Sequence, residues 1–204
     1  MDYAYTYQDV SVDFHKSDMQ ATADSDATYL SEANASSRVA GLHYFGNLKS
    51  NPHQFVNGNV EVLCKQTLTK MSSACNSEYA GLFENSNKII ANRNLAEELG
   101  HHQEPSIIRT DNKCSHDICH RSCKMNKTKS MDMRYHVTRE RQDTGIIDVQ
   151  WGPGETNNAD LFTKIQPVKV IKEKRNMYVK TGPLTSVSKG VLSTSAAGRS
   201  NNLD

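Results

Sequence analysis

The stretch "SIIRTDNKC", Ser106–Cys114, is a short β-branched run that ends on an acid, Asp111, with a basic segment containing Cys and His behind it. Runs of this kind favour buried strands. A buried strand gains nothing from a carboxylate at its tip. In open α/β sheets, however, ligands collect beyond the carboxyl ends of the strands. The position of Asp111 therefore indicates a functional group rather than part of the core.

The preceding half of the chain contains further strand candidates. Arg38–Asn47 and Asn59–Gln66 read as strands, and a loop rich in Asn, Pro and Gly connects them. Residues 9–15, "DVSVDFH", alternate apolar and polar side chains, whereas residues 19–27, "MQATADSDA", are a weaker candidate. We expect the two better strands to form a hairpin with a long connection.

Helical spacing begins at Ser72. Ser72 or Ser73 can cap a long helix, apolar residues recur at helical intervals up to Leu99, and Gly100 is a stop signal. After residues 106–110 come a basic helical region at 124–142, a strand "GIIDVQW" and a short helical piece "NADLFTK". This order predicts an α/β fold with at least one parallel strand pair.

Length and composition indicate one domain. The chain has 204 residues, 36% of them hydrophobic, and a mean hydropathy of -0.67. No apolar run is long enough to span a bilayer and no signal peptide is recognisable, so we expect an intracellular protein without a membrane partner. Five cysteines without a secretory signal favour thiols over a disulfide framework.

The net charge of +1 conceals a charge gradient along the chain. Residues 1–111 contain 8 Lys/Arg and 14 Asp/Glu, whereas residues 112–141 contain 8 and 3, and residues 165–204 contain 7 and 2. Such a separation is expected where carboxylates bind metal and another face holds a polyanion. Ordinary solvated surface explains it as well.

Four acids occupy comparable positions near the ends of predicted strands and the starts of helices: Asp26, Glu78, Asp111 and Asp160. Taken singly, each is most simply a surface or helix-end acid. Together they offer several oxygen ligands from elements that can converge, which is what hard divalent cations require.

Five strings carry a family resemblance: "DSDATYLSEANASSRVAG", "KMSSACNSEYAGLF", "IRTDN", "KTKSMDMRYHVTRERQ" and "WGPGETNNADLFTK". In order and spacing they resemble the ribonuclease H region of copia-type LTR retrotransposon polyproteins, over about residues 1–167. The resemblance implies an α/β ribonuclease H-like fold, a five-stranded mixed sheet flanked by helices. It divides the chain into a lead-in from the polymerase connection (1–17), the domain (18–166) and a basic tail expected to be disordered (167–204).

The resemblance also assigns roles to the four acids. Asp26, rather than Asp24, matches the first metal ligand, Glu78 the helix glutamate, Asp111 the aspartate that ends the fourth strand, and Asp160 the peripheral ligand. It implies two Mg²⁺ (or Mn²⁺) ions and hydrolysis of the RNA strand of RNA/DNA hybrids, with one ion activating water and the other stabilising the leaving 3′ oxygen.

The partners implied are an RNA/DNA hybrid and the reverse transcriptase portion of the same polyprotein, in a cytoplasmic particle or the nucleus. Recognition would use the backbone and the 2′-OH. Basic side chains would hold phosphates, and the candidates are Lys124, Lys127, Lys129, Arg134, Arg139 and Arg141. A solvated helix face is the alternative for these residues.

Two departures from the family pattern leave alternatives open. Lys113 puts a cation beside a proposed metal ligand, and the chain lacks polymerase and integrase regions, so a decayed copy that only binds nucleic acid is one alternative. The segment "CSHDICHRSC", Cys114–Cys123, is the basis of a second, a zinc-binding module that uses soft N/S ligands, although its spacing fits no closed zinc motif.

Overall fold

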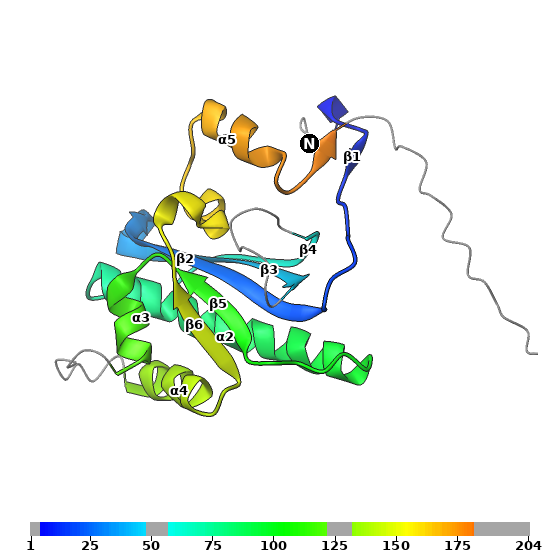
Figure 1. Cartoon of the computed structure of the whole chain (residues 1–204). Helices are drawn as coiled ribbons and strands as arrows, with labels where there is room; N and C mark the ends of the chain where they lie inside the picture. The colour runs from blue at the N-terminus through cyan, green and yellow to red at the C-terminus, as the bar shows by residue number, and fades with distance from the viewer. Residues whose placement is uncertain (1–4, 48–56, 122–131, 182–204) are drawn as a thin grey trace, which may run out of the picture.

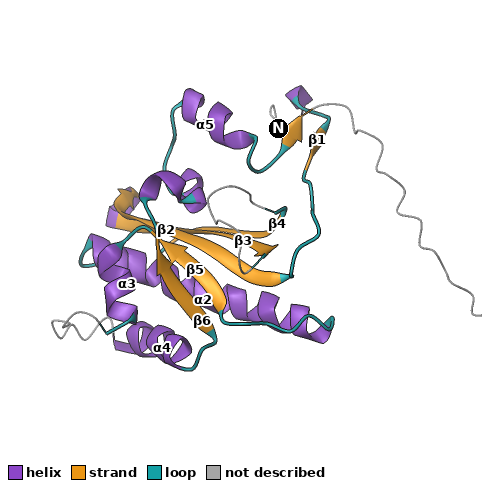
Figure 2. Ribbon diagram, in the orientation of Figure 1, coloured by secondary structure: helices purple, strands orange, loops and turns teal. Residues whose placement is uncertain are grey.

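The computed structural model describes residues 5–47, 57–121 and 132–181, and these form a five-stranded mixed sheet (Figures 1 and 2). The spatial order of its strands is β4-β3-β2-β5-β6. β2 pairs antiparallel with β3, and β3 with β4, whereas β2–β5 and β5–β6 are parallel. The strands are β2 (Gln20–Glu32), β3 (Ser36–Gly46), β4 (Asn59–Gln66), β5 (Ser106–Thr110) and β6 (Ile147–Trp151). The mixed α/β sheet predicted from the sequence is confirmed.

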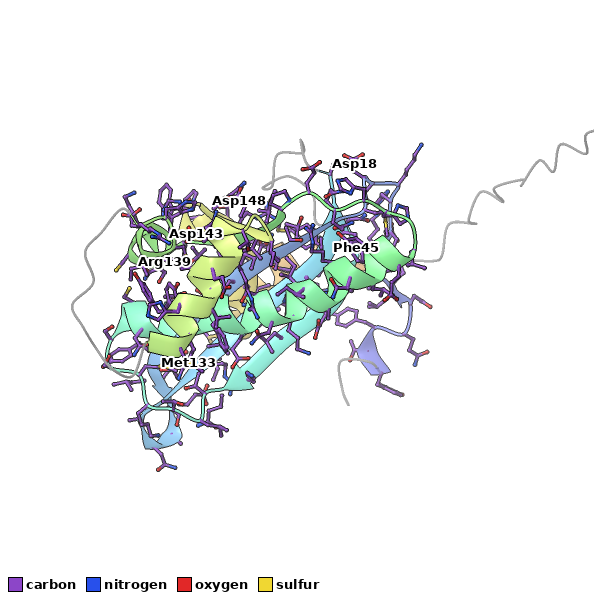
Figure 3. The ribbon with its side chains drawn as sticks, turned by 90° about the horizontal axis from the view of Figure 1, so that it is seen from below. Asp18, Phe45, Met133, Arg139, Asp143 and Asp148 are labelled. Carbon is purple, nitrogen blue, oxygen red and sulfur yellow. The ribbon has the colours of Figure 1, made fainter. Side chains whose placement is uncertain are left out.

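Helices cover one face of this sheet, and Figure 3 shows two of them, α2 and α4, in front of it. They are α2 (Ala74–Glu98), α3 (Lys113–Cys119) and α4 (Asp132–Asp143). Short 3₁₀ turns are η1 (Ala33–Ala35), η3 (Gly154–Thr156) and η4 (Asn158–Phe162). The N-cap of α2 is Ser73, whose hydroxyl accepts the Asn76 N–H, and Gly100 follows the helix with φ of 89°. None of the described helices is long and apolar enough to cross a membrane.

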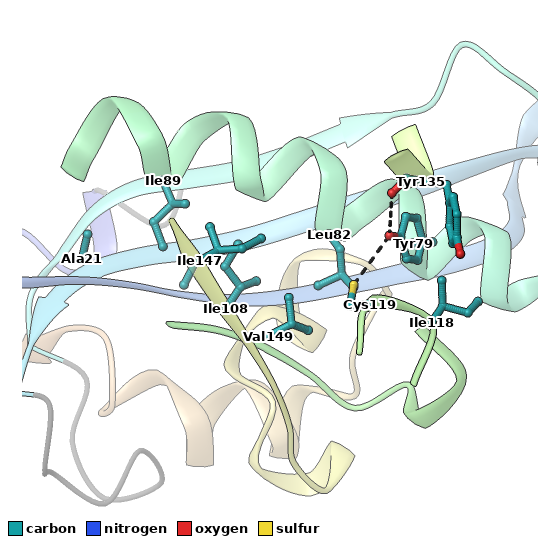
Figure 4. Close-up of a cluster of buried hydrophobic side chains, with 11 residues drawn as sticks. Ala21, Tyr79, Leu82, Ile89, Ile108, Ile118, Cys119, Tyr135, Ile147 and Val149 are labelled. Atoms are coloured by element: carbon teal, nitrogen blue, oxygen red, sulfur yellow. Dashed lines mark hydrogen bonds between the residues drawn. The ribbon is translucent and has the colours of Figure 1, made fainter. Parts of the chain in front are cut away.

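The main hydrophobic core lies between the helices and the sheet (Figure 4). The Tyr79 hydroxyl donates to the Tyr135 carbonyl at 3.2 Å, and the Cys119 thiol donates to the Tyr79 oxygen at 3.6 Å. This packing holds α2 against α3 and α4. It therefore also sets the position of Glu78, which precedes Tyr79 in the chain. The core consists of Ala21, Ala23, Tyr79, Leu82, Ile89, Ile108, Ile118, Cys119, Tyr135, Ile147 and Val149.

The weakest strand candidate of the sequence forms the longest strand, β2, at the centre of the sheet. Its sequence "QATADSDATYLSE" is rich in Ala, Asp, Ser and Thr, and this gives little local strand signal. Its residues from Gln20 to Thr28 are nevertheless all buried. Partners on both sides, β3 and β5, supply the hydrogen bonds, and small side chains allow α2 to approach closely.

A buried polar contact between β3 and α2 sets that approach. The Asn85 amide donates to the Ala40 carbonyl at 2.9 Å and to the Ser25 hydroxyl at 3.0 Å. Its oxygen accepts a hydrogen bond from His43 Nε2 at 2.9 Å. A Cβ atom at Gly41 would lie 1.7 Å from the Asn85 oxygen. Only glycine therefore fits at position 41.

Gly41→Ala should destabilise the chain by about 3 kcal/mol, since the methyl group overlaps a fully buried side chain that four hydrogen bonds hold in place. The matched control is Gly46→Ala on the same strand, where the nearest atom to a new Cβ is a Tyr44 ring carbon at 3.6 Å. Urea unfolding of the two variants measures the difference. Equal midpoints would contradict the packing described here.

The two ends of the described chain meet. The tail was expected to be disordered from residue 167; the structure has α5 (Val168–Arg175) and β7 (Lys180–Thr181) in this segment, and β7 pairs with β1 (Val10–Ser11) of the lead-in. The expected domain boundaries stay a prediction. Tyr178 packs edge-on to Phe162 and donates to the Asn158 carbonyl at 2.8 Å. These few aromatic contacts have no periodic sequence signal. Residues 182–204 lie outside the described part of the chain.

Candidate active site

Three carboxylates from separate elements converge at one end of the sheet. Asp26 lies on β2, Glu78 on α2, and Asp111 directly after β5. One oxygen from each lies within 4.8 Å of the others. Because parallel β2 and β5 pair Asp24 with Arg109, the side chains two residues further along point to the same face. This register brings Asp26 and Asp111 together.

Close contacts between α2 and β2 bring in the third carboxylate. The Ser77 hydroxyl donates to the Thr28 carbonyl at 2.8 Å, which fastens the start of the helix to the end of the strand. One turn later, a Cβ at Gly81 would lie 3.3 Å from the Ser25 hydroxyl oxygen. The helix and strand are therefore nearly in backbone contact, and Glu78 projects between these two anchor points.

Burial and mutual repulsion shift the protonation of these acids. Burial, followed by the Asp26 and Asp111 charges, raises the pKa of Glu78 to about 9. Burial is also the main reason why the pKa of Asp26 rises to about 6, against the opposing hydrogen bond from the Thr163 hydroxyl. Burial likewise raises the pKa of Asp111. Glu78 Oε2 is buried and has no hydrogen-bond partner among the described residues.

This donor set fits a divalent cation. The site gathers three carboxylates with few compensating donors, and it leaves one buried carboxylate oxygen unpaired. Hard cations such as Mg²⁺ take oxygen ligands of this kind, and a cation would offset the repulsion that raises the three pKa values. Asp26, Glu78 and Asp111 are the side chains that could hold it.

Asp160, the fourth predicted ligand, lies at the edge of this group and not within it. Its carboxylate accepts hydrogen bonds from Lys164 at 2.5 Å and from Gln166 at 2.8 Å. Its charge still contributes to raising the pKa values of Asp26 and Asp111. Asp160 is therefore a neighbour of the three acids, and its own carboxylate is hydrogen-bonded to Lys164 and Gln166, which follow it closely in the chain.

Asp24 is not one of the three clustered carboxylates, and its side chain makes a structural ion pair instead. It pairs with Arg109 at 2.7 Å on the neighbouring strand, and the Asn158 amide donates to its other oxygen at 2.6 Å. Both charged side chains are almost fully buried. Asn157, the adjacent residue, donates to the Ser25 carbonyl at 2.9 Å. These asparagines fasten η4 to β2, a role that sequence reasoning missed although "NNAD" stood next to a proposed ligand.

The loop after β6 supports Asp111. The Trp151 indole N–H donates to the Asp111 carbonyl at 3.0 Å, and a Cβ at Gly154 would lie 2.8 Å from an Asp111 carboxylate oxygen. Glycine at position 154 leaves the room that this carboxylate occupies. Neither residue was singled out from the sequence, since their effect depends on the loop folding back over β5.

Among the described lysines, Lys164 and not Lys113 acts on the charges of the three acids. The Lys113 ammonium is largely exposed and points to Asp117, 3.5 Å away and one turn along α3. Lys164, in contrast, pairs with Asp160 and lowers the pKa values of Asp26 and Asp111. The concern that Lys113 competes with a metal ion therefore has no structural basis.

The predicted phosphate-binding residues are only partly within the described chain. Lys124, Lys127 and Lys129 lie outside it. The Arg134 guanidinium lies 3.8 Å from the Met71 sulfur. Arg139 lies over the Tyr135 ring at 4.1 Å and donates to the Ile118 carbonyl at 2.6 Å, and Arg141 donates to the Ser86 hydroxyl. Arg139 and Arg141 thus make packing contacts between helices, which the count of basic residues could not reveal.

The Cys and His residues of α3 do not gather as the zinc alternative requires. Cys119 is buried against Tyr79, whereas Cys114 is exposed at the other end of the helix. His116 and His120 stack at 4.4 Å, but they bind Asp117 and the Val149 carbonyl, respectively. Among the described residues, the Cys/His/Asp/Glu group that could hold a metal is the acid triad. Cys123 lies outside them.

Sequence comparison finds similarity to a retrotransposon polyprotein. Over 95 residues the chain is 30% identical to the retrovirus-related Pol polyprotein from transposon TNT 1-94 of Nicotiana tabacum, a match that covers 47% of this chain and 7% of that polyprotein. The chain is therefore homologous to a small part of a retrotransposon Pol polyprotein. No protein-family model matches it.

Solved structures show the fold. LC11-RNase H1, isolated from compost by a metagenomic approach, superposes with a TM-score of 0.51 at 10% identity, covering 70% of this chain and 91% of that one. The same enzyme in complex with an RNA/DNA hybrid gives 0.50 at 10% identity, covering 70% and 92%. At this identity the likeness concerns the fold alone, and the fold is α/β and ribonuclease H-like.

Proposed function

We propose that this chain is the ribonuclease H region of a copia-type LTR retrotransposon polyprotein, a metal-dependent endonuclease that hydrolyses the RNA strand of RNA/DNA hybrids. The observation that carries the proposal is the convergence of Asp26, Glu78 and Asp111 within 4.8 Å at the end of a ribonuclease H-like sheet. Homology to a Pol polyprotein supports the retrotransposon origin. A fold neighbour solved with a bound RNA/DNA hybrid supports the substrate class.

Asp26, Glu78 and Asp111 would hold two Mg²⁺ (or Mn²⁺) ions, with Asp160 as a peripheral ligand. When bound, the ions supply Lewis-acid activation of a water molecule and stabilisation of the leaving 3′ oxygen. The protein's own contribution is to keep the carboxylates in position. The Thr163 hydroxyl orients Asp26, and the Trp151 indole holds the backbone of Asp111.

Substrate binding would rest on charge and on the sugar. Lys124, Lys127, Lys129 and Arg134 are the proposed phosphate contacts, which predicts binding that weakens as salt rises. Arg139 is a weaker candidate, since its guanidinium already contacts Tyr135 and Ile118. The 2′-OH would distinguish RNA from DNA. The reverse transcriptase portion of the same polyprotein is the proposed protein partner.

The test is cleavage of a duplex in which the RNA and DNA strands carry different labels. With Mg²⁺ or Mn²⁺ the chain should cut only the RNA strand of the hybrid, leave an all-DNA duplex intact, and lose activity in EDTA. A folded chain that binds the hybrid but does not cut it with either metal would overturn the proposal. That result would favour the decayed, binding-only copy.

Lys164→Gln should increase the affinity of the site for Mg²⁺, because the substitution removes a cation that acts on the same carboxylates. We expect the Mg²⁺ concentration for half-maximal thermal stabilisation to fall by roughly threefold. Lys113→Gln is the matched control and should leave this concentration unchanged, since Lys113 points to Asp117. An unchanged or higher Mg²⁺ concentration for half-maximal stabilisation of Lys164→Gln would contradict the expectation that the Lys164 charge weakens metal binding.

A further inference from the structure

Two thiols from different helices meet on the surface beside the acid cluster. Cys75 lies in the first turn of α2 and Cys114 in the first turn of α3, and their Sγ atoms are 2.7 Å apart. Cys114 is exposed and Cys75 is partly buried, so reagents in solvent can reach the pair. Both side chains are thiols, and they contact each other. Their proximity is unrelated to the zinc alternative, which paired Cys114 with residues further along its own segment.

The backbones of the two helix starts are held in place around this pair. The Ser115 hydroxyl donates to the Cys75 carbonyl at 3.3 Å, and Ser115 is itself fully buried. Each helix start is fixed by its own cap, Ser73 for α2 and Asn112 for α3. A disulfide has sulfur atoms about 2.05 Å apart, so the two sulfurs need to approach by only about 0.7 Å.

We propose that Cys75 and Cys114 form a reversible thiol–disulfide site, with hydrogen peroxide as the oxidant. The exposed Cys114 sulfur attacks the peroxide oxygen, which gives a sulfenic acid and releases water. The Cys75 sulfur then attacks the sulfenic sulfur, the S–S bond forms, and hydroxide leaves as a second water after protonation. Overall, two thiols lose two protons and two electrons while one hydrogen peroxide becomes two waters. An external dithiol reverses the change.

The other described cysteines are unsuited to this reaction. Cys119 is buried, and burial raises the pKa of its thiol to about 11, which disfavours the reactive thiolate. Cys64 is exposed on β4, where its thiol donates to the Phe162 carbonyl at 3.1 Å, and no other thiol of the described chain contacts it. Among the cysteines that the structure describes, Cys75 and Cys114 are therefore the pair suited to this reaction.

The disulfide would close a loop between residues 39 positions apart and link α2, which carries Glu78, to α3, which begins two residues after Asp111. Cross-linking residues that are already in contact restricts mainly the unfolded chain. We expect oxidation to raise the melting temperature by roughly 5 to 10 °C. This expectation does not depend on the proposed function, since it concerns stability alone.

In the experiment, the 204-residue chain is treated with hydrogen peroxide and its remaining thiols are blocked with iodoacetamide. The protein is then digested with trypsin without reduction. Cleavage after Lys70, Lys88, Lys113 and Arg121 would leave peptide 71–88 joined to peptide 114–121. Cys114→Ser tests whether Cys114 is the partner, because peptide 114–121 also contains Cys119. Cys64→Ser is the matched control at another exposed cysteine.

The joined peptides and the higher melting temperature should appear in the wild type and in Cys64→Ser, disappear in Cys114→Ser, and be reversed by dithiothreitol. Oxidised wild type without the 71–88 to 114–121 link would overturn the proposal, whether Cys114 is over-oxidised, bonded elsewhere or unmodified. So would a link or a melting shift that persists in Cys114→Ser.

Discussion

Asp111→Asn should reduce RNA-strand cleavage on the order of a thousandfold while the chain remains folded and still binds the hybrid. The substitution keeps the shape of the side chain but removes one of the three charges that would hold the metal ions. A thousandfold loss corresponds to about 4 kcal/mol of transition-state stabilisation, within the several kcal/mol that metal-ion catalysis supplies. Initial rates at saturating Mg²⁺, beside a hybrid-binding assay, measure it.

The stability of the variant separates loss of the site from loss of the fold. Burial raises the pKa of Asp111, so an uncharged amide at this position should leave the metal-free chain as stable as the wild type or more stable. Asp117→Asn, at a partly buried acid of α3 that pairs with Lys113 and His116, is the matched control and should keep full activity. Equal activity of Asp111→Asn and the wild type would remove Asp111 from the site.

Without divalent metal, the chain should become less stable as pH rises from about 4 to about 9. The folded-state pKa of Glu78, about 9, and that of Asp26, about 6, both exceed the ordinary values of 4.5 and 3.8. Unfolding in this range therefore releases protons, and each pKa unit of difference corresponds to about 1.4 kcal/mol. The contribution of these groups is fully present below about pH 4 and is lost as pH passes 6 and then 9. The total loss should be several kcal/mol.

Mg²⁺ should remove most of this pH dependence, because a bound cation favours the charged carboxylates. Urea unfolding at pH 5, 7 and 9, in EDTA and in Mg²⁺, measures the effect. The reference is the double variant Asp26→Asn with Glu78→Gln. All other titrating groups are shared by the two proteins, so they cancel when the unfolding free energy of the variant is subtracted from that of the wild type. The variant itself should respond little to metal. If the metal-free wild type became more stable relative to this variant between pH 5 and 9, the folded-state pKa values of Asp26 and Glu78 would not be raised.

Sequence reasoning succeeded where a local pattern was strong. The caps and apolar spacing of α2 gave its bounds within two residues, and "SIIRT" is β5 with Asp111 directly behind it. In both cases the periodicity and the terminating residue agree. The same local signals were weak for β2, whose Ala, Ser and Asp residues become a strand because both neighbours and α2 enclose it.

Sequence reasoning failed for contacts between distant segments. The pairing of β1 with β7, the Asp24–Arg109 ion pair and the effect of the Lys164 charge on Asp26 and Asp111 all involve residues with no shared periodic pattern. Arg139 is a further example. Sequence reasoning identified it only as a basic residue, whereas in the structure its guanidinium lies over the Tyr135 ring.

The sequence by itself determined the α/β class, the order of the main elements, and the positions of Glu78, Asp111 and Asp160 near element ends, whereas Asp26 lies within β2. The tertiary structure alone decided which of these acids meet: the parallel register of β2 and β5 and the close approach of α2 unite Asp26, Glu78 and Asp111, and leave Asp160 and Asp24 with other partners. The physical reason is range. Periodicity records which neighbours along the chain share a face, whereas burial and repulsion between carboxylates depend on distances that only the packed fold sets.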